Sequence, residues 1–160
     1  MSKLENADAL AQEILKLSRN TLLVNLRFLD AALNRLAWVC VPGETLMTDA
    51  AHIFYAPAHV LSSYKSEKEL PVRDYLHMVL HCVFRHMYIN PSLNRSYWDL
   101  ACDIAVEYVI TELGLKSLTT ARERLQTAYI AAVKHDLKYV TAEKIYAYLR
   151  QTEPDPMRIR

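Results

Sequence analysis

The chain has 160 residues, of which 52% are hydrophobic and only two are glycine, and its formal net charge is +1. This length and composition fit one compact, helix-rich domain with a hydrophobic core of its own, and they argue against a disordered segment. Because 19 basic residues stand against 18 acidic ones without a basic run, the sequence also argues against nucleic-acid binding.

The N-terminal segment and the cysteines bear on the location of the protein. Charges are spread through residues 1–15, so no apolar stretch there is long enough for a signal peptide or a membrane span. The three cysteines, Cys40, Cys82 and Cys102, are odd in number and lack CxxC spacing, which is typical of reduced thiols rather than of a disulfide framework. We expect a cytoplasmic protein that does not enter a membrane.

The predicted elements are mostly helices. Leucines recur at helical spacing over residues 10–17 and again over 22–36, which predicts two amphipathic helices with Asn20 as the N-cap between them. Over residues 38–57, the turn signal Pro42-Gly43 and the β-prone run IFY predict a small β-hairpin. Further helices are predicted over 57–64, from Pro71 through the histidines, over 96–113, 119–134 and 141–151. The predicted class is therefore mainly α with a small β-hairpin (α+β), in a single domain over residues 1–151 followed by a tail or linker over 152–160.

The helix after Pro71 contains three of the six histidines, in the segment YLHMVLHCVFRHMY at residues 75–88. Residues four apart share a helix face, so His77 and His81 form a two-nitrogen clamp suited to a metal ion. Zinc prefers four tetrahedral ligands, and this pair supplies half of them. His86 is turned by about 140° from His81 on a continuous helix, so it can join the pair only if the helix ends near Phe84.

The next predicted helix presents carboxylates at the same spacing. Asp99, Asp103 and Glu107 form one stripe, and apolar neighbours flank it, so these groups need partners such as a metal ion or the histidines. Either feature alone has an ordinary explanation, since histidines four apart can lie in a core or at a surface and an acidic stripe is most often a solvated helix face. Together, on consecutive helices, the two features favour a metal site.

The order of these motifs resembles a zincin-like family described as a putative metallopeptidase domain, found in bacterial proteins with a C-terminal von Willebrand factor A-like region. In that family a TDG…YNP hairpin precedes an HExxHxxxxH helix, and a W-x-x-A-x-D helix follows. The matching residues, within about 45–115, are Thr48, Asp49, Tyr55, Ala56, Pro57, His77, His81, His86, Trp98, Ala101 and Asp103. The resemblance implies a zincin-like helical domain in which a histidine helix pairs with an acidic helix.

The resemblance also implies roles for individual residues. His77 and His81 would bind Zn²⁺, with Asp103 as the third ligand and Glu107 orienting one histidine. Glu107 could instead act as a displaced general base, and His86 is the alternative third ligand. The strand that ends at Tyr55 could be an edge strand that binds a polypeptide substrate by strand addition, or it could simply cover the core.

The sequence departs from the family pattern at two positions. Ala50 replaces the glycine of the hairpin, and Met78 replaces the glutamate that serves as the general base in such hydrolases. Because methionine cannot accept a proton, we predict a zinc-binding, metallopeptidase-like domain with lost or altered hydrolytic activity.

Two other functions stay open. The resemblance implies a non-catalytic interaction or adaptor module that works with a MoxR-type AAA ATPase, because the von Willebrand-linked proteins often accompany such ATPases. The residues also allow a helical regulatory domain without metal, in which histidines and acids form a buried polar network.

Overall fold

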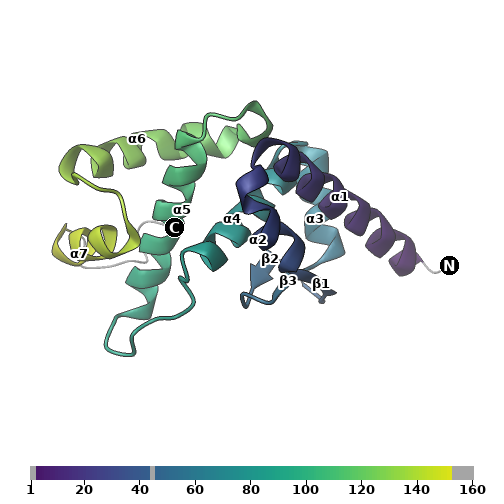
Figure 1. Cartoon of the computed structure of the whole chain (residues 1–160), viewed down its shortest axis with the longest axis horizontal. Coiled ribbons are helices and arrows are strands. Elements are labelled where there is room, and N and C mark those ends of the chain that lie inside the picture. The colour runs from purple at the N-terminus through teal and green to yellow at the C-terminus, as the bar shows by residue number, and fades with distance from the viewer. Residues whose placement is uncertain (1–2, 44–45, 153–160) are drawn as a thin grey trace.

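The computed structural model describes residues 3–43 and 46–152, which form a mainly helical fold with one small sheet (Figure 1). The elements in chain order are α1 (Lys3–Asn25), the 3-10 helix η1 (Arg27–Leu29), α2 (Asp30–Arg35), β1 (Ala37–Cys40), β2 (Leu46–Thr48), β3 (His52–Tyr55), α3 (Pro57–Ser66), α4 (Leu70–Val83), α5 (Arg95–Glu112), the 3-10 helix η2 (Lys116–Leu118), α6 (Ala121–Asp136) and α7 (Ala142–Thr152). The predicted class, mainly α with a small β part, is confirmed. Nearly all of the predicted tail, residues 153–160, lies outside the described residues.

The N-terminal helix differs from the prediction. α1 continues through Asn20 to Asn25, whereas the sequence predicts a helix boundary at Asn20. One buried stripe runs along the helix without interruption and is formed by Ala11, Leu15, Ser18 and Leu22. Because this stripe packs on the core as one face, the helix has no reason to break at Asn20, which lies on the exposed side. The chain leaves helical geometry at Leu26, with φ −130° and ψ 58°.

The sheet has the strand order β1-β3-β2, with β3 parallel to β1 and antiparallel to β2. β2 and β3 form a hairpin, but its turn lies at residues 49–51 rather than at the predicted signal Pro42-Gly43, which follows β1, a strand that does not pair with β2. Asp49 Oδ1 stabilises the hairpin turn by accepting hydrogen bonds from the N–H groups of Ala51 and His52. Of the two alternatives for the strand that ends at Tyr55, the edge strand is wrong, because β3 lies in the centre of the sheet, and the covering of the core is confirmed, because Tyr55 is only 1% exposed. The edge strand that contacts α4 is β2.

The hairpin turn also explains one departure from the family pattern. Ala50 has a φ of 75°, in the left-handed region that favours glycine. A residue with a side chain is strained there by about 1–2 kcal/mol, whereas glycine adopts the conformation freely. The glycine that the resemblance leads us to expect would therefore suit this backbone better than alanine does.

Two hydrophobic clusters hold the helices together. The first joins α1, α2, β3 and α4 around Leu15, Leu76 and Ile53, and the second joins α5 to α6 and α7. α5 contributes Ile110 to the first cluster and Ala101 to the second, so it connects the two halves of the molecule seen in Figure 1. None of the described helices combines the length and the apolar character that crossing a membrane requires.

Candidate metal centre

α4 carries both histidines of the predicted clamp on one face. Pro71 lies in its first turn, where a missing N–H costs no hydrogen bond, and residues such as Leu76 and Leu80 bury the helix in the core. The side chains of His77 and His81 are only 12% and 15% exposed. Their Nε2 atoms lie 2.8 Å apart, so α4 brings two imidazole nitrogens to one point.

α5 brings a carboxylate to the same point. The helix begins after Asn94, whose side-chain oxygen accepts a hydrogen bond from the N–H of Tyr97. Farther along, Asp103 places Oδ1 3.2 Å from His81 Nε2 and 3.5 Å from His77 Nε2. The ligand atoms of these three residues all lie within 4.8 Å of one another. Two helices therefore supply three ligand atoms to one small volume.

The three side chains fit a tetrahedral metal ion. With ligand distances of about 2.0–2.1 Å, two ligands of tetrahedral zinc stand about 3.3–3.4 Å apart. Both distances from Asp103 Oδ1 are close to this value, and the nitrogen pair has to open by only about half an ångström. Without a metal, two facing imidazole nitrogens are compatible only if one of them carries a proton. His77, His81 and Asp103 could therefore hold a metal ion.

Glu107 fixes the orientation of the first histidine. Its Oε1 lies 2.7 Å from His77 Nδ1, which makes Nδ1 the donor and leaves Nε2 to face the cluster. Its Oε2 accepts two hydrogen bonds from Arg73, from Nε at 2.9 Å and from Nη2 at 2.7 Å. Arg73 is completely buried and also donates to the carbonyl oxygen of Leu118 at 2.8 Å. A chain of hydrogen bonds thus runs from η2 through Arg73 and Glu107 to His77.

The electrostatics of the cluster favour charged side chains. Burial opposes protonation of His77, but hydrogen bonds to Asp103 and Glu107 prevail and raise its pKa to about 9. Burial likewise opposes ionisation of Asp103 and Glu107, but their hydrogen bonds to His77 hold the pKa of both carboxyls below the usual range. In the metal-free protein, a proton on His77 therefore balances the carboxylates in place of a cation.

His86 does not reach the ligand cluster. α4 ends at Val83 in a Schellman motif, in which the N–H of Arg85 donates to the carbonyl of Cys82 and the N–H of His86 to that of His81. The helix thus ends early, as ligation by His86 would require. However, this end places His86 Nδ1 3.2 Å from His81 Nδ1, the ring nitrogen that does not face Asp103. Burial, together with the neighbouring His81, lowers the pKa of His86 to about 4. His86 is therefore neutral and contacts His81 at the ring nitrogen that faces away from Asp103.

Two further residues of the acidic helix point elsewhere. Trp98 donates from Nε1 to the carbonyl oxygen of His86 at 3.0 Å, which ties the loop after α4 to α5. Asp99 accepts hydrogen bonds from Arg95 Nε at 3.0 and 3.1 Å. Of the predicted acidic stripe, Asp103 and Glu107 contact the histidines, whereas Asp99 pairs with an arginine on its own helix.

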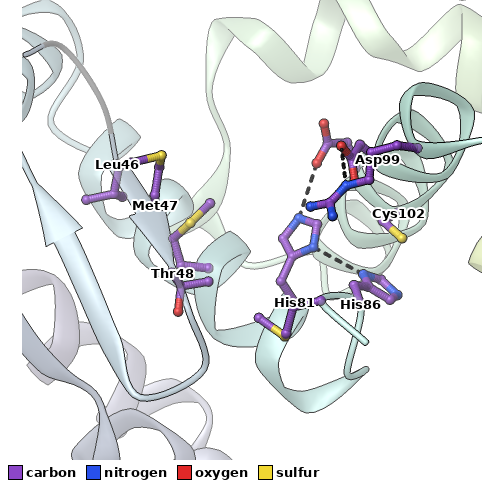
Figure 2. Close-up of a pocket in the computed structure, with 11 residues that line it drawn as sticks. Leu46, Met47, Thr48, His81, His86, Asp99 and Cys102 are labelled. Carbon is purple, nitrogen blue, oxygen red and sulfur yellow. Dashed lines mark hydrogen bonds and ion pairs between the residues drawn. The ribbon is translucent and has the colours of Figure 1, made fainter. Parts of the chain in front are cut away.

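Two cavities flank the ligand cluster. Figure 2 shows the smaller one, of about 280 Å³, with the β2 residues Leu46, Met47 and Thr48 on one side and His81, His86, Asp99 and Cys102 on the other. The larger one, of about 580 Å³, is lined by His77, Asp103 and Glu107 and by Arg122 and Gln126 of α6. Leu46, Met78 and Asp103 line both cavities, so Met78 lies at their junction.

Sequence analysis misses two arginines of this region. Arg73 lies one turn before His77 on a mostly apolar stretch of α4, and a charged residue within a buried helix face is the signal that could have indicated a buried partner. Arg122 comes from α6, and its Nη1 lies 2.9 Å from Asp74 Oδ1 and 4.0 Å from Glu107 Oε1. No pattern in the sequence links α6 to the histidines.

Comparison with known proteins assigns the chain to a family. A family model with the description "Putative metallopeptidase domain" matches residues 12–157. Neither the curated proteins nor the solved structures yield a match. The family match reaches from α1 to beyond α7, so it takes in the outer helices as well as the residues of the candidate metal centre. Since the match covers most of the chain, the protein belongs to the putative metallopeptidase domain family.

Proposed function

We propose that the chain is a zinc-binding, metallopeptidase-like domain in which His77, His81 and Asp103 hold the metal ion and hydrolytic activity is lost or altered. The observation that carries the proposal is the convergence of their three ligand atoms within 4.8 Å. Two imidazoles and a carboxylate form a donor set typical of catalytic zinc sites, which keep a fourth position open. Zinc bound there supplies Lewis-acid chemistry, because it polarises a carbonyl group and lowers the pKa of water.

The described residues that line the cavities offer no carboxylate free to act as a general base. Asp74 pairs with Arg122, Asp99 with Arg95, and Glu107 with both Arg73 and His77. Asp103 belongs to the proposed ligand set, and the thioether of Met78 cannot accept a proton. The engagement of both oxygens of Glu107 argues against the displaced-base role and favours a role in orienting His77. Hydrolysis by the standard route therefore lacks its proton acceptor.

A polypeptide is the ligand that the surroundings of the site favour. β2 is an edge strand, and its three residues border the smaller cavity beside His81. An edge strand can pair with an extended peptide through main-chain hydrogen bonds, while adjacent cavities receive the side chains. The lack of a base also favours a second function, non-catalytic binding of a polypeptide or protein partner. A MoxR-type AAA ATPase as that partner remains what the resemblance implies, and a cytoplasmic location remains a prediction from the sequence.

Metal analysis tests the proposal. Protein purified without chelators is analysed for zinc per chain beside His77→Ala and the matched control His135→Ala, whose side chain is 89% exposed and pairs with Asp136 away from the cluster. We expect about one zinc per chain in wild type and control, and none in His77→Ala. A wild-type protein that takes up no zinc when offered the metal would contradict the proposal and favour the metal-free polar network.

A further inference from the structure

The larger cavity contains a polar wall that zinc ligation does not use. Arg122 and Gln126, one turn apart on α6, line the same cavity as His77 and Asp103. Residues four apart on a helix present their side chains side by side, with Cβ atoms about 5–6 Å from each other. α6 therefore offers a guanidinium and an amide next to the ligand cluster.

The guanidinium of Arg122 is held by one ion pair and keeps further N–H donors for a ligand. Its Nη1 donates to Asp74 Oδ1 at 2.9 Å, and its side chain is 40% exposed against 12% for Asp74. Among the described residues, its other nitrogens have no hydrogen-bond acceptor. Since a guanidinium has five N–H donors in a planar fork that matches a carboxylate, Arg122 is held in place at one nitrogen and can bind an anion with the others.

The amide of Gln126 has an orphaned acceptor. Its Oε1 is buried and has no hydrogen-bond partner among the residues that the structure describes. A buried polar atom without a partner costs about 1–3 kcal/mol, so a ligand that donates a hydrogen bond to this oxygen relieves the cost. Gln126 lines the cavity, and a rotation of its amide toward the cavity would let a ligand N–H group reach this oxygen, while the free nitrogens of Arg122 attract an anion.

The C-terminal residue of a peptide has a hydrogen-bond donor and an anion attached to the same Cα, namely the backbone N–H and the α-carboxylate. We propose that the larger cavity binds the C-terminal residue of a polypeptide, with Arg122 pairing with the carboxylate and Gln126 Oε1 accepting the N–H. The inference rests on the proposed function, because it places that polypeptide beside the zinc ligands. It defines the ligand as a chain end rather than an internal segment.

The charges of the cavity make this binding depend on the metal ion. Asp74, Asp103 and Glu107 contribute three carboxylates, against the guanidinium of Arg122 and that of Arg73 behind Glu107. A bound divalent cation brings two positive charges and displaces the single proton that His77 holds in the metal-free protein, so it makes the cavity more positive by one charge. By linkage, zinc and a free carboxylate should each strengthen the binding of the other, whereas a peptide without that charge should respond much less to zinc.

Fluorescence anisotropy with a labelled peptide tests the inference. The probe is fluorescein-Gly-Ala-Leu-Ala, as the free acid and as the C-terminal amide, titrated with the full chain in the presence and absence of zinc. We expect wild type with zinc to bind the acid about tenfold more tightly than the amide, because an Arg–carboxylate pair is a charge-assisted hydrogen bond. Arg122→Gln should lose this preference, and Gln126→Leu should weaken acid and amide equally, since both carry the N–H.

Controls keep the result interpretable. Arg95→Gln removes a guanidinium from the smaller cavity and should retain the preference for the acid. Arg122→Lys keeps the charge beside Asp74, so it should stay folded and retain part of the preference. Zinc affinity is measured separately for each variant, because Arg122 Nη1 lies 4.0 Å from Glu107 Oε1, so failure of the metal site and failure of this inference are distinguishable. Equal binding of acid and amide by wild type, a preference that survives Arg122→Gln, or one that disappears in Arg95→Gln would each overturn the inference.

Discussion

Arg73 donates two hydrogen bonds to a single oxygen of Glu107, at 2.9 and 2.7 Å, from a side chain that is completely buried. The other oxygen of Glu107 lies 2.7 Å from His77. The orientation of His77, the first of the proposed metal ligands, therefore depends on an ion pair inside the core. Such a pair contributes little net stability over apolar residues, but removing one partner leaves a buried charge behind.

Arg73→Met should destabilise the protein strongly. The carboxylate of Glu107 would lose its buried partner, so we expect the free energy of unfolding to fall by about 3–5 kcal/mol. Urea unfolding of the metal-free protein measures this loss. Arg35→Met, at an exposed position of α2, is the matched control and should change stability by less than about 0.5 kcal/mol. Equal stabilities of the two variants would count against a dependence of the core on the Arg73–Glu107 pair.

Asp103→Asn and His86→Ala should separate the two candidate third ligands. Asp103 Oδ1 lies 3.2 Å from His81 Nε2, whereas His86 contacts only the other ring nitrogen of His81. We expect Asp103→Asn to weaken zinc binding by more than about 100-fold, and His86→Ala, as loss of a supporting contact, by about tenfold. Competition with a chromophoric chelator gives both affinities. The reverse order would identify His86 as the ligand.

Met78→Glu should create or greatly increase hydrolysis. A carboxylate at this position would lie at the junction of the two cavities and could accept a proton, a function worth about 10²–10⁴-fold in rate. The assay is zinc-dependent cleavage of fluorescently labelled casein, on which we expect wild type to be inert. Met78→Gln is the matched control, since it has a similar length without a base. Rapid zinc-dependent cleavage by wild type would contradict the proposed loss of the standard route.

The stability of the metal-free protein should fall as the pH rises through about 9. The pKa of His77 is raised to about 9 in the folded protein, from about 6.5 when unfolded, so its protonation stabilises the fold fully below about pH 6.5. That contribution disappears as the proton leaves at higher pH. Urea unfolding in EDTA at pH 6 and pH 9.5 measures the loss of stability. The loss should be smaller in His77→Gln, because this variant lacks the titrating imidazole, and it should not vanish, because other titrating groups remain.

The same proton competes with zinc, because only a neutral imidazole can ligate. Zinc affinity should therefore rise with pH up to about 9, well above the range of an ordinary histidine. An affinity that is flat between pH 6 and pH 9 would argue against ligation by His77.

Ala50→Gly should stabilise the protein. The change removes about 1–2 kcal/mol of left-handed strain at φ 75° and adds about 0.4–1 kcal/mol of chain entropy to the unfolded state, so we expect a gain of about 0.5–1 kcal/mol. The midpoint of urea unfolding reports it. Ala51→Gly lies next in the chain at an ordinary backbone conformation and should destabilise instead. A loss of stability in Ala50→Gly would contradict the assignment of strain to this turn.

The parts of the site that depend on spacing along one helix could be predicted from the sequence. His77 and His81 share a face of α4, and Asp103 and Glu107 share a face of α5, because helical periodicity alone determines this. The loop between the two helices brings the faces together. Helix boundaries were less predictable: Asn20 has the chemistry of an N-cap, yet the buried stripe of α1 continues past it.

Contacts between elements far apart in the chain could not be predicted from sequence patterns. The role of Arg73 depends on Glu107, 34 positions away, and on the carbonyl of Leu118. The position of His86 depends on the left-handed backbone of Arg85, a residue type that gives no sign of such a turn. Arg122 approaches Glu107 only because the chain after η2 brings the start of α6 beside Asp74, near the start of α4. Each of these placements follows from tertiary packing.

Met78 lines both cavities together with Leu46 and Asp103. A ligand that occupies both cavities would contact Met78, so the size of residue 78 matters as well as its chemistry. Methionine suits such a position, since its unbranched thioether rotates about three bonds and repacks at low cost. A glutamate there would place a charge where both cavities meet, so a chain that regained the base would also change which ligands fit both cavities.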